Sequence, residues 1–116
     1  PPYEEKQDYQ RVVTALQDAL QRFATGTYLI WYPLLQRAEP QQMIEKLKRL
    51  QLASWLHVTL TVQSPSEEGF GMHGSGLFIV NPPWTLPATL QETLPWLTES
   101  LSQDDGASYT LEHHIP

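Results

Sequence analysis

Two short segments of the chain join a proline pair to an aromatic residue: Pro1-Pro2-Tyr3 and Asn81-Pro82-Pro83-Trp84. Successive prolines stiffen the backbone and hold a carbonyl group in a fixed direction. Such a carbonyl, together with the side-chain oxygen of a preceding Asp or Asn, can accept the hydrogens of an amino group and orient it for reaction. The aromatic ring can stack on a flat base that carries the amine. Both segments are therefore candidates for a site that acts on an exocyclic amine.

Either segment can also be a rigid turn capped by a packed ring, because prolines commonly end strands. Asn81-Pro82-Pro83-Trp84 is the complete pattern, whereas Pro1-Pro2-Tyr3 lacks its polar residue. Taken alone, the local pattern favours the second segment, so the choice depends on the surrounding sequence.

The apolar pattern predicts the elements that must position these segments. Helical spacing predicts helices over residues 8–24, 40–50 and 86–101, with a kink or a restart at Pro95. Strands are predicted over residues 27–32, with Pro33 ending the strand, and over 55–62, 77–80 and 109–115. Residues 64–76 contain four of the six glycines and predict a loop.

This order of elements predicts an α/β fold. The nearly unbroken apolar run over residues 27–32 is typical of a strand covered on both faces, as in a parallel sheet. The first helix has no strand before it, so we expect a strand that ends just before Pro1. A sheet split there exposes an unpaired edge, and we expect the isolated segment to be marginally stable or to self-associate.

Composition restricts the class of protein. The chain has 116 residues, 41% of them hydrophobic, which is enough for one domain with a core. The absence of Cys indicates a reducing compartment and excludes thiol catalysis, disulfides and Cys-based zinc sites from this segment. Since the sequence contains no run long enough to cross a bilayer and starts without a secretory signal, we expect a cytoplasmic protein without membrane contact.

The charge balance disfavours nucleic acid as a partner of the whole surface. Seven Lys and Arg residues against thirteen Asp and Glu residues give a formal net charge of −6. A nucleic-acid site must therefore be local, or its basic surface must lie in another part of the protein.

Several segments, in order along the chain, resemble successive signatures of one family. They are residues 1–4 (PPYE), 6–9 (KQDY), 22–28 (RFATGTY), 29–33 (LIWYP), 71–76 (GMHGSG), 80–84 (VNPPW) and 94–97 (LPWL). Together they resemble the ribosomal RNA large-subunit methyltransferase J family, RlmJ, and the resemblance covers nearly the whole chain.

The resemblance implies a Rossmann-like, S-adenosylmethionine-dependent methyltransferase that methylates N6 of an adenine in large-subunit (23S) rRNA. The family motif is Asp-Pro-Pro-Tyr at the end of the fourth strand, which implies catalytic roles for Pro1, Pro2 and Tyr3. The Asp that should precede Pro1 is absent from the chain. Residues 1–116 would be the C-terminal half of one methyltransferase domain, without cofactor-binding residues of their own and inactive alone.

The resemblance gives no catalytic role to residues 81–84, which we expect to end a strand and to place Trp84 against its neighbours. It implies large-subunit rRNA as the partner and no metal, and leaves the oligomeric state open, with a monomer compatible for the full-length protein. Two other functions remain open: a non-catalytic module that binds nucleic acid or another protein, and a factor in the use of external DNA as nutrient, an older label of the family.

Histidines and one serine are weaker candidates for chemistry. His57 and His73 could ligate a metal, but no Cys and no close carboxylate pattern accompany them. His113 and His114 should point to opposite faces of a strand, which disfavours a shared metal. Ser75 has no His and acid partners at any hydrolase spacing.

Two further groups have open roles. Residues 69–76 could flank the target nucleotide or form a tight connection, and the second is favoured. A cationic group could face RNA, although a solvated helix surface is the default interpretation. Its members are Arg37, Lys46, Lys48 and Arg49.

Overall fold

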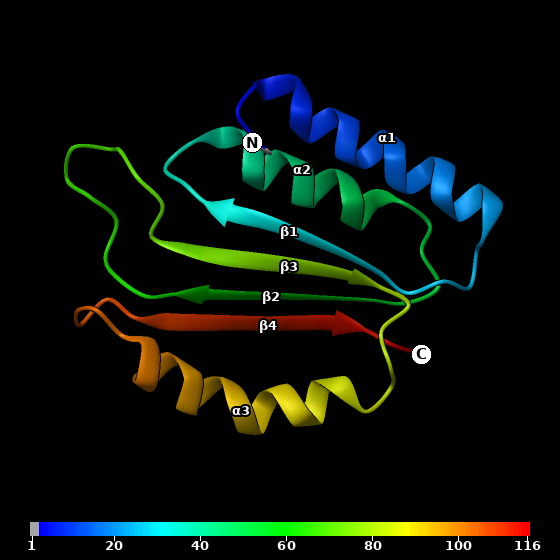
Figure 1. Cartoon of the computed structure of the whole chain (residues 1–116). Coiled ribbons are helices and arrows are strands. Elements are labelled where there is room, and N and C mark those ends of the chain that lie inside the picture. Colours follow the sequence, from blue (N-terminus) through cyan, green and yellow to red (C-terminus); the bar gives the residue numbers. More distant parts are fainter. Residues whose placement is uncertain (1–2) are drawn as a thin grey trace.

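The computed structural model describes residues 3–116, and within this range three helices and four strands follow the predicted order (Figure 1). The elements are α1 (Lys6–Arg22), β1 (Tyr28–Leu34), α2 (Ala38–Arg49), β2 (Trp55–Thr61), β3 (Gly74–Val80), α3 (Leu86–Leu101) and β4 (Ser108–His114). The predicted α/β class, a sheet with flanking helices, is confirmed.

The four strands of residues 3–116 form one sheet in the order β1-β3-β2-β4, and each neighbouring pair is antiparallel. The expected parallel pairing is therefore wrong for these strands. β1 and β2 do run in the same direction, but β3 turns back after the loop at residues 62–73 and lies between them (Figure 1). In the part of the chain described, β1 and β4 are the two edges of the sheet.

Two predicted strand ends are wrong for identifiable reasons. β1 continues through Pro33 to Leu34, because a proline without a backbone N–H is tolerated in an edge strand. β3 begins at Gly74 rather than at Leu77. A Cβ on Gly74 would lie 2.3 Å from the Leu60 carbonyl oxygen, so this glycine allows close approach of two strands rather than marking a loop.

The helices agree with the predictions except at Pro95. The Glu5 and Asp8 side chains form a capping box that satisfies backbone N–H groups at the start of α1. α3 passes through Pro95 as one helix, so of the two expected outcomes, a kink or a restart, the restart does not occur. None of the helices between residues 3 and 116 combines the length and apolar character that a membrane span requires.

Apolar cores lie on both faces of the sheet, because successive residues of a strand point to opposite sides. One core packs α1 and α2 against the sheet and consists of Tyr9, Val13, Leu16, Ile30, Tyr32, Met43, Ile44, Leu47, Phe78 and Val80. The core under α3 consists of Leu56, Val58, Ile79 and Leu94. Since α3 contacts β2 and β4, two β1 side chains on this face remain exposed: Leu29 is 63% and Trp31 42% exposed.

Candidate functional site

Tyr3 is the only one of the three predicted catalytic residues that the structure describes, because Pro1 and Pro2 lie outside the described residues. Its backbone adopts a left-handed conformation, with φ of 64°, immediately before α1. Its hydroxyl donates a hydrogen bond to the backbone carbonyl of Trp31 in β1. The Tyr3 ring centroid lies 4.8 Å from that of Tyr9 and 6.1 Å from that of Trp31. Tyr3 is therefore anchored to the edge strand by both its hydroxyl and its ring.

The Tyr3 hydroxyl acts as a neutral hydrogen-bond donor. Burial, and to a smaller extent the neighbouring Tyr9 hydroxyl, raises the pKa of Tyr3 above its usual value. Because the phenol stays protonated at neutral pH, it keeps its bond to the Trp31 carbonyl. Tyr3 can thus position a substrate through its ring, while its hydroxyl is not available as a base.

The start of α1 lies over the end of the sheet where β1 and β2 terminate (Figure 1). In open α/β sheets, ligands bind outside the carboxyl ends of parallel strands, and β1 and β2, which run in the same direction, both end here. A hollow of about 250 Å³ opens at this end, and Arg37, His57, His73 and Thr110 contribute to its polar lining. This end of the molecule therefore offers both an anchored aromatic ring and a polar recess.

Asn81 lies at the opposite end of the sheet, where β1 begins and β3 ends, since Tyr28 pairs with Val80. The Asn81 backbone is left-handed, with φ of 54°. Its side-chain amide donates to the carbonyls of Ala24 at 2.9 Å and Gly26 at 2.8 Å. Its own carbonyl accepts a 2.8 Å bond from the Thr27 hydroxyl. These contacts hold the connection between α1 and β1 in place. The amide hydrogens of Asn81 are used in these bonds and are not free for a substrate.

Residues 81–84 end β3 at Val80, as predicted, but Trp84 does not pack against its neighbours. Its side chain is 82% exposed, so that expectation is wrong. The Leu86 N–H donates to the Pro83 carbonyl at 3.0 Å, which shows that the proline pair leads directly into α3. The tight turn leaves the Trp84 ring outside both cores.

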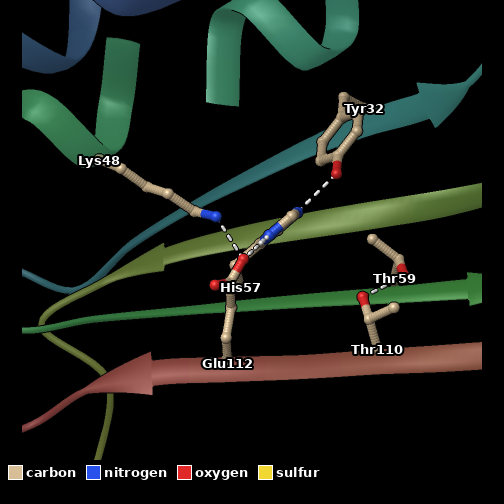
Figure 2. A network of polar contacts seen from close by, with 6 residues as sticks. All are labelled: Tyr32, Lys48, His57, Thr59, Thr110 and Glu112. Atoms are coloured by element: carbon tan, nitrogen blue, oxygen red, sulfur yellow. Dashed lines mark hydrogen bonds and ion pairs between the residues drawn. The ribbon is translucent and has the colours of Figure 1, made fainter. Parts of the chain in front are cut away.

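A polar network around the buried His57 joins three strands and one helix near the centre of the sheet (Figure 2). His57 is only 7% exposed, and its Nε2 lies 2.6 Å from the Tyr32 hydroxyl. Its Nδ1 lies 3.0 Å from Oε1 of Glu112, which also accepts a hydrogen bond from Lys48. β1, β2, β4 and α2 are therefore connected through a single imidazole.

The protonation of this network follows from its surroundings. Burial lowers the pKa of His57, although the hydrogen bond to Glu112 opposes that shift. Burial and the charge of Glu112 raise the pKa of Tyr32 to about 12. Burial alone would raise the pKa of Glu112, but hydrogen bonds from His57 and Lys48 outweigh it and hold this pKa below the usual range. These directions assign a neutral His57. Its Nδ1–H donates a hydrogen bond to Glu112, and its Nε2 accepts a hydrogen bond from the Tyr32 hydroxyl.

Gly76 makes this network possible. A Cβ at residue 76 would lie 2.2 Å from Cζ of Tyr32, because the Tyr32 ring lies directly over the glycine. Tyr32 and Thr59 both pair with Gly76 across the sheet. The missing side chain therefore lets the Tyr32 ring lie flat on β3 and reach His57.

The structure gives the histidine and serine candidates different surroundings. Both ring nitrogens of His57 are engaged, whereas His73 Nδ1 is buried without a hydrogen-bond partner. His113 and His114 are exposed in β4, and Ser75 is half-buried in β3. Among residues 3–116, no three potential metal ligands gather in one place.

The cationic group is largely engaged within the protein. Lys46 donates to Gln10 at 2.9 Å, and Lys48 bonds Glu112. Arg37 lies 3.3 Å from Glu39. Arg49 is exposed. These contacts do not gather the four side chains into a continuous basic surface.

Sequence reasoning missed the roles of Trp31, Tyr32, Gly76 and Glu112. The alternation over residues 55–62 correctly placed His57 on the more polar face of its strand. Its partners could not be identified because they depend on register: His57 pairs with Glu112 across 55 positions of sequence. Gly76 carried a usable signal, since a glycine beside an apolar strand often marks close approach of another group.

Comparison with known protein families identifies the chain. The family model described as "Ribosomal RNA large subunit methyltransferase D, RlmJ" matches residues 1–114. The chain therefore belongs to the RlmJ family.

Curated relatives extend this finding. The chain is 40% identical over 116 residues to the ribosomal RNA large subunit methyltransferase J of Haemophilus influenzae and 41% identical to that of Escherichia coli. In both cases all of the chain aligns but only 41% of the relative, so the chain spans about two fifths of their length.

A solved structure has the same fold. The crystal structure of a Legionella pneumophila protein with the family label DUF519 superposes with a TM-score of 0.83 at 32% identity. The superposition covers 97% of this chain and 40% of that protein.

Proposed function

We propose that this chain is the C-terminal half of one methyltransferase domain, and that the full-length protein transfers a methyl group from S-adenosylmethionine to N6 of an adenine in large-subunit (23S) rRNA. The observation that carries the proposal is the match of the chain to two enzymes named ribosomal RNA large subunit methyltransferase J. The anchor of Tyr3 to Trp31 in β1 supports it. Action on ribosomal RNA would place the protein in the cytoplasm.

Residues of this chain would hold the adenine rather than the methyl donor. In the proposed site, a backbone carbonyl of Pro1 or Pro2 and the Asp expected before them accept hydrogens of the exocyclic amine. The Tyr3 ring stacks on the flipped-out base, and its bond to the Trp31 carbonyl fixes the ring in place. S-adenosylmethionine supplies an electrophilic methyl group to an amine oriented in this way.

The edge formed by β1 supports a cofactor-binding half upstream of Pro1. β1 has one strand neighbour among the described residues, and no described strand pairs with its other side. Leu29 and Trp31 are exposed beside this edge. An unpaired, partly apolar edge fits a further strand, which would place the donor site next to Tyr3. Without that half, we expect residues 1–116 to transfer no methyl group.

The test uses the full-length protein that carries this segment, with unmodified large-subunit rRNA as substrate. Tyr3→Ala removes the stacking ring, and we expect kcat/KM to fall about 10- to 100-fold. Formation of N6-methyladenosine is measured by mass spectrometry of the digested RNA. Tyr3→Phe is the matched control, because it keeps the ring and loses only the bond to Trp31.

Two outcomes would contradict the proposal. A Tyr3→Ala protein that methylates at the parent rate would remove Tyr3 from the mechanism. A parent protein that binds rRNA but transfers no methyl group would instead favour a non-catalytic binding module.

A further inference from the structure

The loop between β2 and β3, residues 62–73, carries two uncovered apolar side chains. Phe70 is 78% exposed and Met72 is 51% exposed. The loop projects from the sheet end where β1 terminates, which is also the end where α1 begins (Figure 1). Large apolar side chains exposed together commonly mark a binding surface.

The base of this loop is fixed to the rest of the fold. The His73 N–H donates to the Leu34 carbonyl at 3.1 Å, and the Val62 N–H donates to the His73 carbonyl at 2.9 Å. The Gln36 side chain reaches across from the connection between β1 and α2 and donates to the Ser66 carbonyl at 2.7 Å. The exposed tip is therefore held at a defined position relative to β1.

Two glycines determine the backbone around Phe70. Gly69 has φ of 80° and Gly71 has φ of 89°, a region that other residues rarely adopt. A Cβ at either position would meet no atom within 4 Å, so backbone conformation rather than crowding requires glycine. The Gly69 N–H closes a turn by donating to the Ser66 carbonyl at 3.1 Å, and Phe70 follows this turn between the two glycines.

The loop tip is close enough to Tyr3 to touch the same RNA strand. Tyr3 is anchored at Trp31, and the loop is anchored at Leu34, three residues further along β1. Three strand residues span about 10 Å, and the three residues from His73 to Phe70 add at most about as much. The loop tip therefore lies within about 20 Å of the Trp31 anchor, a span that a short stretch of single-stranded RNA running from the target adenine can bridge.

The charges around Phe70 favour a base over a phosphate. Glu67 and Glu68 are exposed beside the tip and would repel the RNA backbone. A base can stack on an aromatic ring through its flat face without any charge contact. We propose that Phe70 stacks on a single-stranded nucleotide that flanks the methylated adenine, with Met72 beside it. This inference rests on the proposed rRNA methyltransferase function.

The experiment compares two exposed aromatic residues in the full-length protein with unmodified large-subunit rRNA. Phe70→Ala should raise KM for the RNA about 5- to 150-fold and leave kcat within about twofold, because the stacking ring binds RNA outside the reacting base. Phe70→Tyr keeps the ring and should retain the parent KM. Trp84→Ala is the matched control: Trp84 is 82% exposed at the other end of the sheet, and its loss should leave KM unchanged.

A KM for Phe70→Ala equal to that of the parent overturns the inference, as does an equal rise in Trp84→Ala. A lower melting temperature in Phe70→Ala would also overturn it if KM returns to the parent value under conditions in which the variant is fully folded. The rise in KM would then come from loss of folding and not from loss of the ring. If Phe70 instead contacts a protein partner, KM for protein-free rRNA will not change. A parent that methylates no RNA refutes the proposed function, whereas an active parent with an unaffected Phe70→Ala variant refutes this inference alone.

Discussion

The two segments that join a proline pair to an aromatic residue lie at opposite ends of the same sheet and have opposite relations to it. At one end, Tyr3 is half-buried and anchored to β1 through its hydroxyl. At the other, Asn81 uses its amide hydrogens to clamp the Ala24 and Gly26 carbonyls, and Trp84 projects into solvent. In the segment with the more complete pattern, the side-chain amide is used to hold two backbone carbonyls and is not free to orient a substrate. A complete local pattern is therefore not enough to indicate chemistry.

The largest expected effect concerns the sheet beneath the Tyr3 end. Gly76→Ala places a Cβ 2.2 Å from Cζ of Tyr32, and moving that ring away also breaks its hydrogen bond to His57. We expect the free energy of unfolding of the full-length protein to fall by about 3 kcal/mol, measured by urea denaturation. Because Tyr32 adjoins Trp31, methylation per folded molecule should also fall.

A Gly76→Ala/Tyr32→Leu protein is the control, because the smaller side chain at residue 32 makes room for the new methyl group. It should recover part of the lost stability. If Gly76→Ala alone is as stable as the parent, the close approach of Tyr32 to β3 does not constrain this sheet.

A smaller effect on the free energy of unfolding is expected at Asn81, which holds the connection between α1 and β1. Asn81→Ala removes the bonds to two carbonyls and puts a less tolerant residue at positive φ, which should lower the free energy of unfolding by about 2 kcal/mol. Asn81→Gly keeps the backbone conformation and should lose less. The folded fraction of both variants should methylate RNA at the parent rate.

The methylation rate of the folded Asn81 variants is the most direct test of the difference between the two segments. A folded Asn81→Ala protein without activity would give residues 81–84 a chemical role and remove the distinction between the segments.

The smallest expected effect is a pH dependence of stability. Because the pKa of His57 is lowered by folding, the unfolded chain binds more protons below its usual value of 6.5. The contribution of His57 is therefore fully present above that pH and declines as pH falls toward the folded pKa. The groups that face this imidazole are Tyr32, Lys48 and Glu112, and Glu112 remains ionised because its own pKa is lowered.

The measurement is the free energy of unfolding between about pH 7.5 and about pH 5.5. The parent should lose stability over this range, and His57→Gln should lose less because it cannot titrate. Equal slopes in the two proteins would mean that His57 does not carry the dependence.

The elements themselves could be predicted because each has a local signal. The spacing of Tyr9, Val13 and Leu16 identified α1, and the alternation over residues 55–62 identified β2. The pairing could not be predicted, since an apolar run such as that of β1 is compatible with either strand direction. β1 is also less covered than its composition suggests, because α3 lies over the other half of the sheet and leaves Leu29 and Trp31 exposed.

The candidate site is indicated only by the resemblance over the whole chain and stays a prediction. Nothing in the types of Pro1, Pro2 and Tyr3 distinguishes them from a turn, and the anchor of Tyr3 is a backbone carbonyl that has no sequence signal. The network of His57 depends on register between strands distant in sequence, which single-residue patterns do not contain.

The contact between Gly76 and Tyr32 also predicts how the sequence can change. A larger residue at 76 is acceptable only where residue 32 is small, and a small residue at 32 leaves His57 without its hydroxyl partner. Positions 32, 57 and 76 should therefore show strong epistasis: single changes are harmful, and only particular combinations restore a stable protein. Libraries that vary this sheet will be more productive if they mutate the three positions together.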